Sequence, residues 1–210
     1  MNVFSPAMLK SFEQCPRKYF FRYVKNISVP QSESFFQKGK NIHALANYYL
    51  KGENIEKFER ALNEEEKSVW NKLKSVEYFN KEIIASEYKL NFKLNNLWFG
   101  GRLDALVKQD NSYIILDYKT GVLPKNPQYD YQTMIYILAV SKYFLTDDVK
   151  FVYIDLKNGN DVVVELTSDL KIEYEKKLTD VGKKLVISEN SQVFLKKTKD
   201  CKCEYDKICV

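Results

Sequence analysis

The segment Tyr113–Lys119, with the sequence YIILDYK, places the strongest constraint on the fold of this chain. Successive side chains of a strand point to opposite faces of its sheet. The odd-numbered residues therefore share one face, which ends in Asp117 and Lys119, and the even-numbered residues share the other. Both faces are largely apolar, which is typical of a central strand that is covered on both sides.

The flanking sequence predicts further strands and helices. Residues 86–94 alternate between apolar and polar side chains, as in a strand with one face in water. Residues 97–108 form the next strand, and together with 113–119 the three strands make a meander. Strands at 151–157 and 161–166 enclose an Asn-Gly-Asn turn. Helical spacing marks residues 5–15, 17–27, 35–50, 54–79, 130–145 and 169–187. This order predicts an α/β protein with a mixed central β-sheet flanked by helices.

Length and composition fit one domain that spans residues 1–210. The chain is 45% hydrophobic and 29% charged, so it can form a substantial core. It has no apolar run long enough to cross a bilayer and no signal-peptide pattern, so we expect a cytoplasmic protein without a membrane partner. The net charge of +5 permits a nucleic-acid partner without requiring one.

Two acids stand on neighbouring strands of the predicted meander. Asp104 belongs to residues 97–108 and Asp117 to residues 113–119. Two carboxylates at one place repel each other, and a divalent cation between them removes that repulsion. Mg²⁺ prefers such hard oxygen ligands. The alternative is an ordinary ion pair between Asp117 and Lys119 at the end of the sheet, with Asp104 as a surface acid.

Three motifs, GGRLDAL, IILDYKTG and YQTMIY, together resemble the PD-(D/E)XK nuclease superfamily, and in particular its RecB-like branch. The resemblance covers nearly the whole chain. The chain is most similar to stand-alone CRISPR-associated RecB-like exonucleases and to AddB-type nuclease domains. The resemblance implies a restriction-endonuclease-like core whose termini are joined by a four-cysteine cluster.

The resemblance implies roles for individual residues. Asp104, Asp117, the backbone carbonyl of Tyr118 and His43 would hold Mg²⁺ or Mn²⁺. Lys119 would orient the attacking water or stabilise the transition state. A lone histidine on a helix can equally be a surface or core residue.

The resemblance also points to three further catalytic residues. Glu87 matches an acid of the family, although its position also fits the wet face of an alternating strand. Gln132 and Tyr136 lie four residues apart on a helix and so share a face. They either lie near the active site and the DNA backbone or form the polar edge of an amphipathic helix.

All four cysteines lie near the two ends of the chain, at Cys15, Cys201, Cys203 and Cys209. The resemblance implies that they bind a [4Fe-4S] cluster, and a structural Zn²⁺ is the alternative. One residue separates Cys201 from Cys203 where the family usually has two, so this pair departs from the family pattern.

The resemblance implies a Mg²⁺- or Mn²⁺-dependent DNA nuclease, most simply an exonuclease on single-stranded or frayed ends. The basic residues of the 17–27 helix either meet phosphates or form a solvated edge. CRISPR adaptation or recombination proteins are the expected partners. The alternatives are a non-cleaving DNA-end-binding or adaptor module, for example in a CRISPR adaptation complex, and an unrelated zinc-stabilised binding domain.

Overall fold

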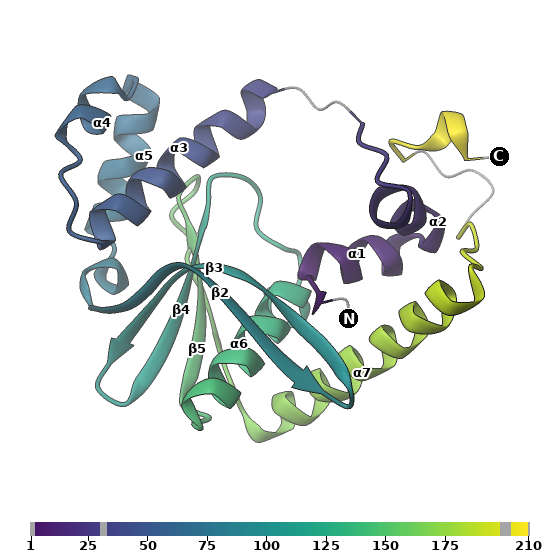
Figure 1. Cartoon of the computed structure of the whole chain (residues 1–210). Coiled ribbons are helices and arrows are strands. Elements are labelled where there is room, and N and C mark those ends of the chain that lie inside the picture. Colours follow the sequence, from purple (N-terminus) through teal and green to yellow (C-terminus); the bar gives the residue numbers. More distant parts are fainter. Residues whose placement is uncertain (1–2, 30–32, 198–202, 210) are drawn as a thin grey trace.

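A mixed β-sheet forms the centre of the molecule (Figure 1). The computed structural model of the chain describes residues 3–29, 33–197 and 203–209, and for residues 33–38 it describes the backbone alone. The described strands are β1 (Val3–Phe4), β2 (Glu82–Leu94), β3 (Leu97–Gln109), β4 (Ser112–Lys119), β5 (Val149–Asp155) and β6 (Val162–Glu165). Their order is β1-β3-β4-β5-β6, and β2 pairs with β3.

The predicted meander is confirmed, because β2, β3 and β4 pair in antiparallel fashion. Strand β5 then lies parallel to β4, and β6 returns antiparallel to β5. The parallel step needs a crossover, which α6 (Tyr131–Phe144) supplies. The pairing of β1 with β3 is parallel and was not predicted.

Helices cover both faces of the sheet. Helices α1 (Pro6–Gln14), α6 and α7 (Ser168–Ser191) pack on the face that carries Ile115. Helices α3 (Glu33–Leu50) and α5 (Glu64–Ser75) pack on the face that carries Leu116. The opposite faces of β4 therefore belong to separate hydrophobic cores, which confirms that it is a strand buried on both sides.

The predicted helical stretch at 54–79 is interrupted. It divides into α4 (Glu56–Ala61), α5 and a 3₁₀ turn at Glu77–Asn80. Asn63 begins α5 with a capping box, in which it accepts a hydrogen bond from the Glu66 amide at 2.9 Å and Glu66 accepts one from the Asn63 amide at 3.0 Å. This side-chain capping favours a helix start at Asn63 over continuation of α4.

The alternating pattern predicted for β2 holds only in part. Leu90, Phe92 and Leu94 are buried as expected, but Tyr88 is 41% exposed. The reason is local, because Glu87 has a left-handed φ of 48° that interrupts the regular pleat.

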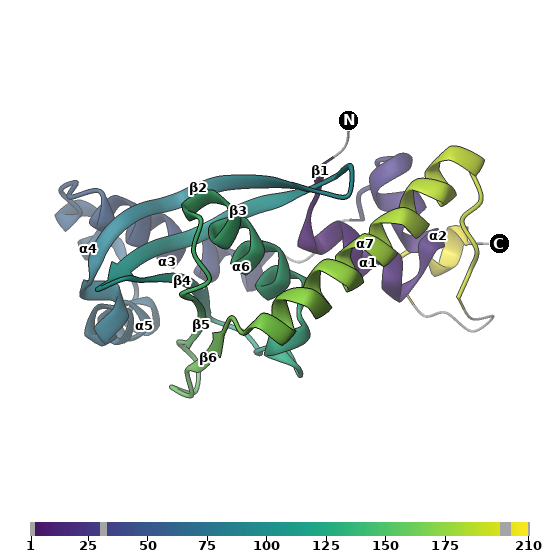
Figure 2. The same ribbon diagram turned by 90° about the horizontal axis from the view of Figure 1, so that it is seen from below.

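Helices α1 and α2 and the C-terminal segment lie at the same end of the molecule (Figure 2). Helix α1 stops at Gln14, and α2 (Pro16–Tyr19) follows and continues as a π-helical turn at Phe20–Val24. A C-terminal 3₁₀ turn at Asp206–Ile208 packs nearby. Within the described ranges, no helix combines the length and the apolar character needed to cross a membrane.

Candidate active site

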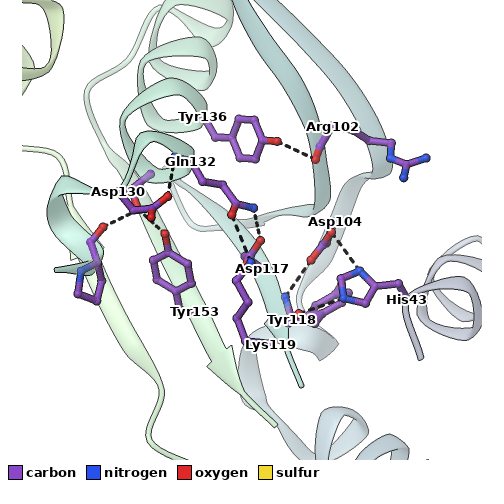
Figure 3. A network of polar contacts seen from close by, with 12 residues as sticks. His43, Arg102, Asp104, Asp117, Tyr118, Lys119, Asp130, Gln132, Tyr136 and Tyr153 are labelled. Atoms are coloured by element: carbon purple, nitrogen blue, oxygen red, sulfur yellow. Dashed lines mark hydrogen bonds and ion pairs between the residues drawn. The ribbon is translucent and has the colours of Figure 1, made fainter. Parts of the chain in front are cut away.

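The candidate site lies where β3 and β4 separate (Figure 3). Their pairing ends at Ala105 and Leu116, so Asp104 and Asp117 would form the next pair in register. The Asp104 carboxylate instead accepts a hydrogen bond from the backbone N–H of Tyr118 at 2.9 Å. The Asp104 side chain thus takes the place of the backbone hydrogen bond that would continue the pairing of β3 with β4. This contact holds Asp104 near Asp117.

His43 reaches this place from α3. Its Nδ1 lies 3.2 Å from an Asp104 oxygen, and its Nε2 lies 3.0 Å from the Tyr118 carbonyl oxygen. Both neighbours are acceptors, so a protonated imidazole satisfies both contacts. Burial lowers the pKa of His43, but the hydrogen bond and charge of Asp104 outweigh it and raise the pKa above its ordinary value.

Glu87 completes a group with His43 and Asp104. One ligand atom from each of these residues lies within 4.8 Å of the others. Glu87 forms an ion pair with the Arg102 guanidinium at 2.7 Å. Burial raises the pKa of Glu87 despite that positive neighbour. Its left-handed backbone is an uncommon conformation for a residue other than glycine, and such conformations cluster at functional sites.

Asp117 is 2% exposed and lies beside this group. Its carboxylate pairs with Lys119 Nζ at 2.7 Å and accepts a hydrogen bond from the Gln132 side-chain amide. Lys119 also donates to Gln132 Oε1 at 3.2 Å, so the three side chains form a closed ring of contacts. Burial, followed by the charge of Asp104, raises the pKa of Asp117 to about 6.

Helix α6 positions Gln132 and Tyr136 in different ways. Asp130 caps the helix and accepts from the Gln132 backbone N–H at 2.9 Å, which directs the Gln132 side chain toward Asp117. The Tyr136 hydroxyl donates to the Arg102 carbonyl at 2.9 Å. Its ring lies so close to Gly101 that a Cβ there would be 2.6 Å from the hydroxyl oxygen. Tyr136 therefore braces β3.

The side chains at the site suit a hard divalent cation. Carboxylate and carbonyl oxygens with one imidazole match the ligands of Mg²⁺ and Mn²⁺. Among the described residues, His43, Glu87 and Asp104 are the group whose ligand atoms converge, and Asp117 is not part of that trio. Burial and then repulsion from Asp104 raise the pKa of Asp117, and a cation would relieve that repulsion.

Two grooves open onto the site. One of about 590 Å³ exposes His43, Glu87 and Asp104. The other, of about 800 Å³, passes Lys119, Gln132 and Tyr136. Arg102 lines both, and the larger groove also carries the basic residues Lys10 and Lys125. Sequence reasoning missed these three residues, although Arg102 stands only two places before Asp104.

The described cysteines lie at the end of the molecule where α1, α2 and the C-terminal segment come together. Cys15 is buried between α1 and α2, Cys209 is buried, and Cys203 is half-buried. The C-terminal segment contacts the N-terminal helices through the Lys18–Glu204 ion pair at 3.0 Å and through the Tyr205 hydroxyl, which donates to the Ile27 carbonyl at 2.8 Å. Cys201 lies outside the described residues.

Comparisons with known proteins agree with this architecture. Over 96% of its length, the chain superposes on 86% of a crystal structure named as a candidate exonuclease from Eubacterium rectale, with a TM-score of 0.64 and 12% identity. It also superposes over 99% of its length on 85% of the protein SSO0001, with a TM-score of 0.53 and 18% identity. These identities show a shared fold alone.

Sequence comparison gives the family. No curated protein sequence matches the chain significantly. The model of the PD-(D/E)XK nuclease superfamily matches residues 3–210, a range that contains every residue of the candidate site. The chain therefore belongs to the PD-(D/E)XK nuclease superfamily.

Proposed function

We propose that this protein is a divalent-metal-dependent DNA nuclease of the RecB-like branch. It hydrolyses phosphodiester bonds and acts as an exonuclease on single-stranded or frayed ends, with residues 1–210 as one nuclease domain. One observation carries the proposal: in a member of this superfamily, Asp104, Asp117 and His43 meet where β3 and β4 separate, with Lys119 held beside them.

The metal ligands in this proposal are Asp104, Asp117, His43 and the Tyr118 carbonyl, and Glu87 stands next to them. A bound Mg²⁺ or Mn²⁺ lowers the pKa of water and neutralises charge that develops on the phosphate. His43 binds such a cation as neutral imidazole, so metal binding competes with the proton that Asp104 favours.

Lys119 supplies positive charge next to the scissile phosphate. Its Nζ is held by Asp117 at 2.7 Å and by Gln132 at 3.2 Å, which restricts the long side chain to one direction. Such preorganised charge stabilises a transition state more than a mobile lysine does. Gln132 is a positioning residue in this scheme, and Tyr136 holds β3 in place.

The substrate in this proposal lies in the larger groove. It is lined by four basic residues and one acid, Asp130. The basic residues are Lys10, Arg102, Lys119 and Lys125. A basic groove of this kind follows a sugar–phosphate backbone. The structural neighbour from Eubacterium rectale is itself named as a candidate exonuclease, which favours attack at strand ends.

Labelled linear and circular single-stranded DNA test the proposal. The protein is incubated with each substrate in Mg²⁺, in Mn²⁺ and in EDTA. We expect degradation of linear DNA with either metal, none in EDTA, and intact circles. Asp104→Asn should lower the rate about 100-fold or more. Asp110→Asn, an exposed acid on the β3–β4 turn, is the matched control and should cut normally. Binding without cutting would favour the DNA-end-binding module instead.

We also propose that the four cysteines hold a [4Fe-4S] cluster that joins the termini. Buried Cys15 and Cys209 support it, as do the contacts of the C-terminal segment with α2 and with the residues that follow it. Analysis of the purified protein for iron, acid-labile sulfide and zinc tests this assignment. Zinc without iron would replace the cluster by a structural zinc site. CRISPR adaptation or recombination proteins remain the proposed partners.

A further inference from the structure

A third groove, here called the α1–α7 groove, is lined by residues of helices α1 and α7. Figure 2 shows α1 and α7 beside each other at this end of the molecule. The groove has a volume of about 720 Å³ and runs between these helices and residues 195–197. Nothing in the nuclease mechanism uses it.

Positive charge dominates the rim of this groove. Five lysines line it against three acids, namely Lys176, Lys177, Lys184, Lys196 and Lys197 against Glu13, Glu173 and Asp180. Lys196 and Lys197 donate to the backbone carbonyls of Cys209 and Glu13, and neither lysine has an ion-pair partner within the described ranges. Lys176 and Lys184 are exposed, and neither has an ion-pair partner in the part of the chain that the structure describes.

The floor of the groove is apolar and aromatic. Phe12, Val181 and Tyr131 are buried there, and Leu195 stands 71% exposed at the edge. The Tyr131 hydroxyl is buried and makes no hydrogen bond of normal geometry with described residues. Burial and the charge of the nearby Glu13 carboxylate raise its pKa, so the hydroxyl stays protonated. Lysines above an apolar floor match the phosphates of a single strand.

Consecutive residues at the start of α6 line the active-site groove and the α1–α7 groove. Asp130 lines the active-site groove, and the next residue, Tyr131, lines the α1–α7 groove. Lys10 of α1 pairs with Asp130 at 3.4 Å at this junction. A strand that extends from the active-site groove to the α1–α7 groove would pass this ion pair.

We infer that the groove between α1, α7 and residues 195–197 binds the part of a single DNA strand that lies beyond the cleaved end. This inference rests on the proposed nuclease function and deepens it. It assigns the substrate as an extended single strand whose affinity grows with length. Only strands long enough to reach the α1–α7 groove gain affinity from it.

Binding of short and long oligonucleotides tests the inference. Fluorescent oligothymidylates of about 5 and about 20 nucleotides span the site sizes of single-strand-binding grooves. Affinity is measured by anisotropy in EDTA, so that no cleavage occurs. We expect the double variant Lys176→Glu/Lys184→Glu to bind the long strand roughly tenfold more weakly and the short strand unchanged. For the long strand, the plot of log K against log salt concentration should also become less steep by roughly 1.4, because the double variant loses two phosphate contacts.

Lys57→Glu provides the control for general charge. Lys57 is exposed on α4, at the opposite end of the molecule, and its replacement makes half the charge change of the double variant. It should bind both strands normally. Circular dichroism and urea unfolding confirm that each variant is folded before its affinity is compared.

The outcomes separate the inference from the nuclease proposal. An equal effect on short and long strands, or no effect on either, overturns the groove assignment, and the latter result would fit an acidic protein partner there. An equal loss of affinity in Lys57→Glu also overturns it, because general charge would then explain the effect. Length-dependent binding in a protein that never cuts DNA would support the groove and refute the nuclease.

Discussion

Replacement of Asp117 by asparagine should stabilise the metal-free protein while removing its cleavage activity. Asp117 is 2% exposed, and burial together with the charge of Asp104 raises its pKa from 3.8 to about 6. One pKa unit corresponds to about 1.4 kcal/mol, so holding this carboxylate ionised at pH 8 costs about 3 kcal/mol. Asparagine has nearly the same shape and no charge.

The pH dependence follows from the sign of the pKa change. The folded protein holds the Asp117 proton more tightly than the unfolded chain does. The stability from this residue is therefore complete below the unfolded pKa and is lost as the pH rises through about 6. The variant should exceed the wild type by about 3 kcal/mol at pH 8 and by about half as much at pH 5.

Urea unfolding in EDTA at several pH values measures this difference. Asp110→Asn, on the exposed turn, should unfold like the wild type at every pH. Added Mg²⁺ should stabilise the wild type and leave Asp117→Asn nearly unchanged, because binding to the folded state alone raises stability. If Asp117→Asn were equal to or less stable than the wild type at pH 8, the carboxylate would not be held under electrostatic stress and the argument for a cation would fail.

Other variants test how the site is held in place. Tyr136→Phe leaves the Arg102 carbonyl without its partner and should cost about 1 kcal/mol in urea unfolding, with a larger loss of cleavage if β3 shifts. Gly101→Ala places a Cβ 2.6 Å from the Tyr136 hydroxyl oxygen and should cost about 1–3 kcal/mol; an unchanged unfolding midpoint would contradict that close packing. Asn63→Ala removes the cap of α5 and should cost about 1 kcal/mol without changing cleavage, because α5 lies outside the site.

The pattern of apolar residues sufficed to predict the central sheet. The alternation in 113–119 identified β4 as a strand buried on both faces, because period-2 patterns follow directly from strand geometry. The same reasoning placed the meander, the β5–β6 hairpin and the buried α6. It failed where single side chains decided the outcome, at the Asn63 cap that divides α4 from α5 and at Glu87, whose backbone turns left-handed.

Motif order in the chain predicted a set of candidate site residues, and only the fold decides which of them contact one another. Asp104 follows Arg102 in sequence, but only the separation of β3 from β4 turns its carboxylate to the Tyr118 amide and toward His43 of α3. The ring of contacts among Asp117, Lys119 and Gln132 likewise needs α6 packed on the sheet. Contacts between distant segments depend on how strands twist and separate, and no local pattern in a sequence encodes that geometry.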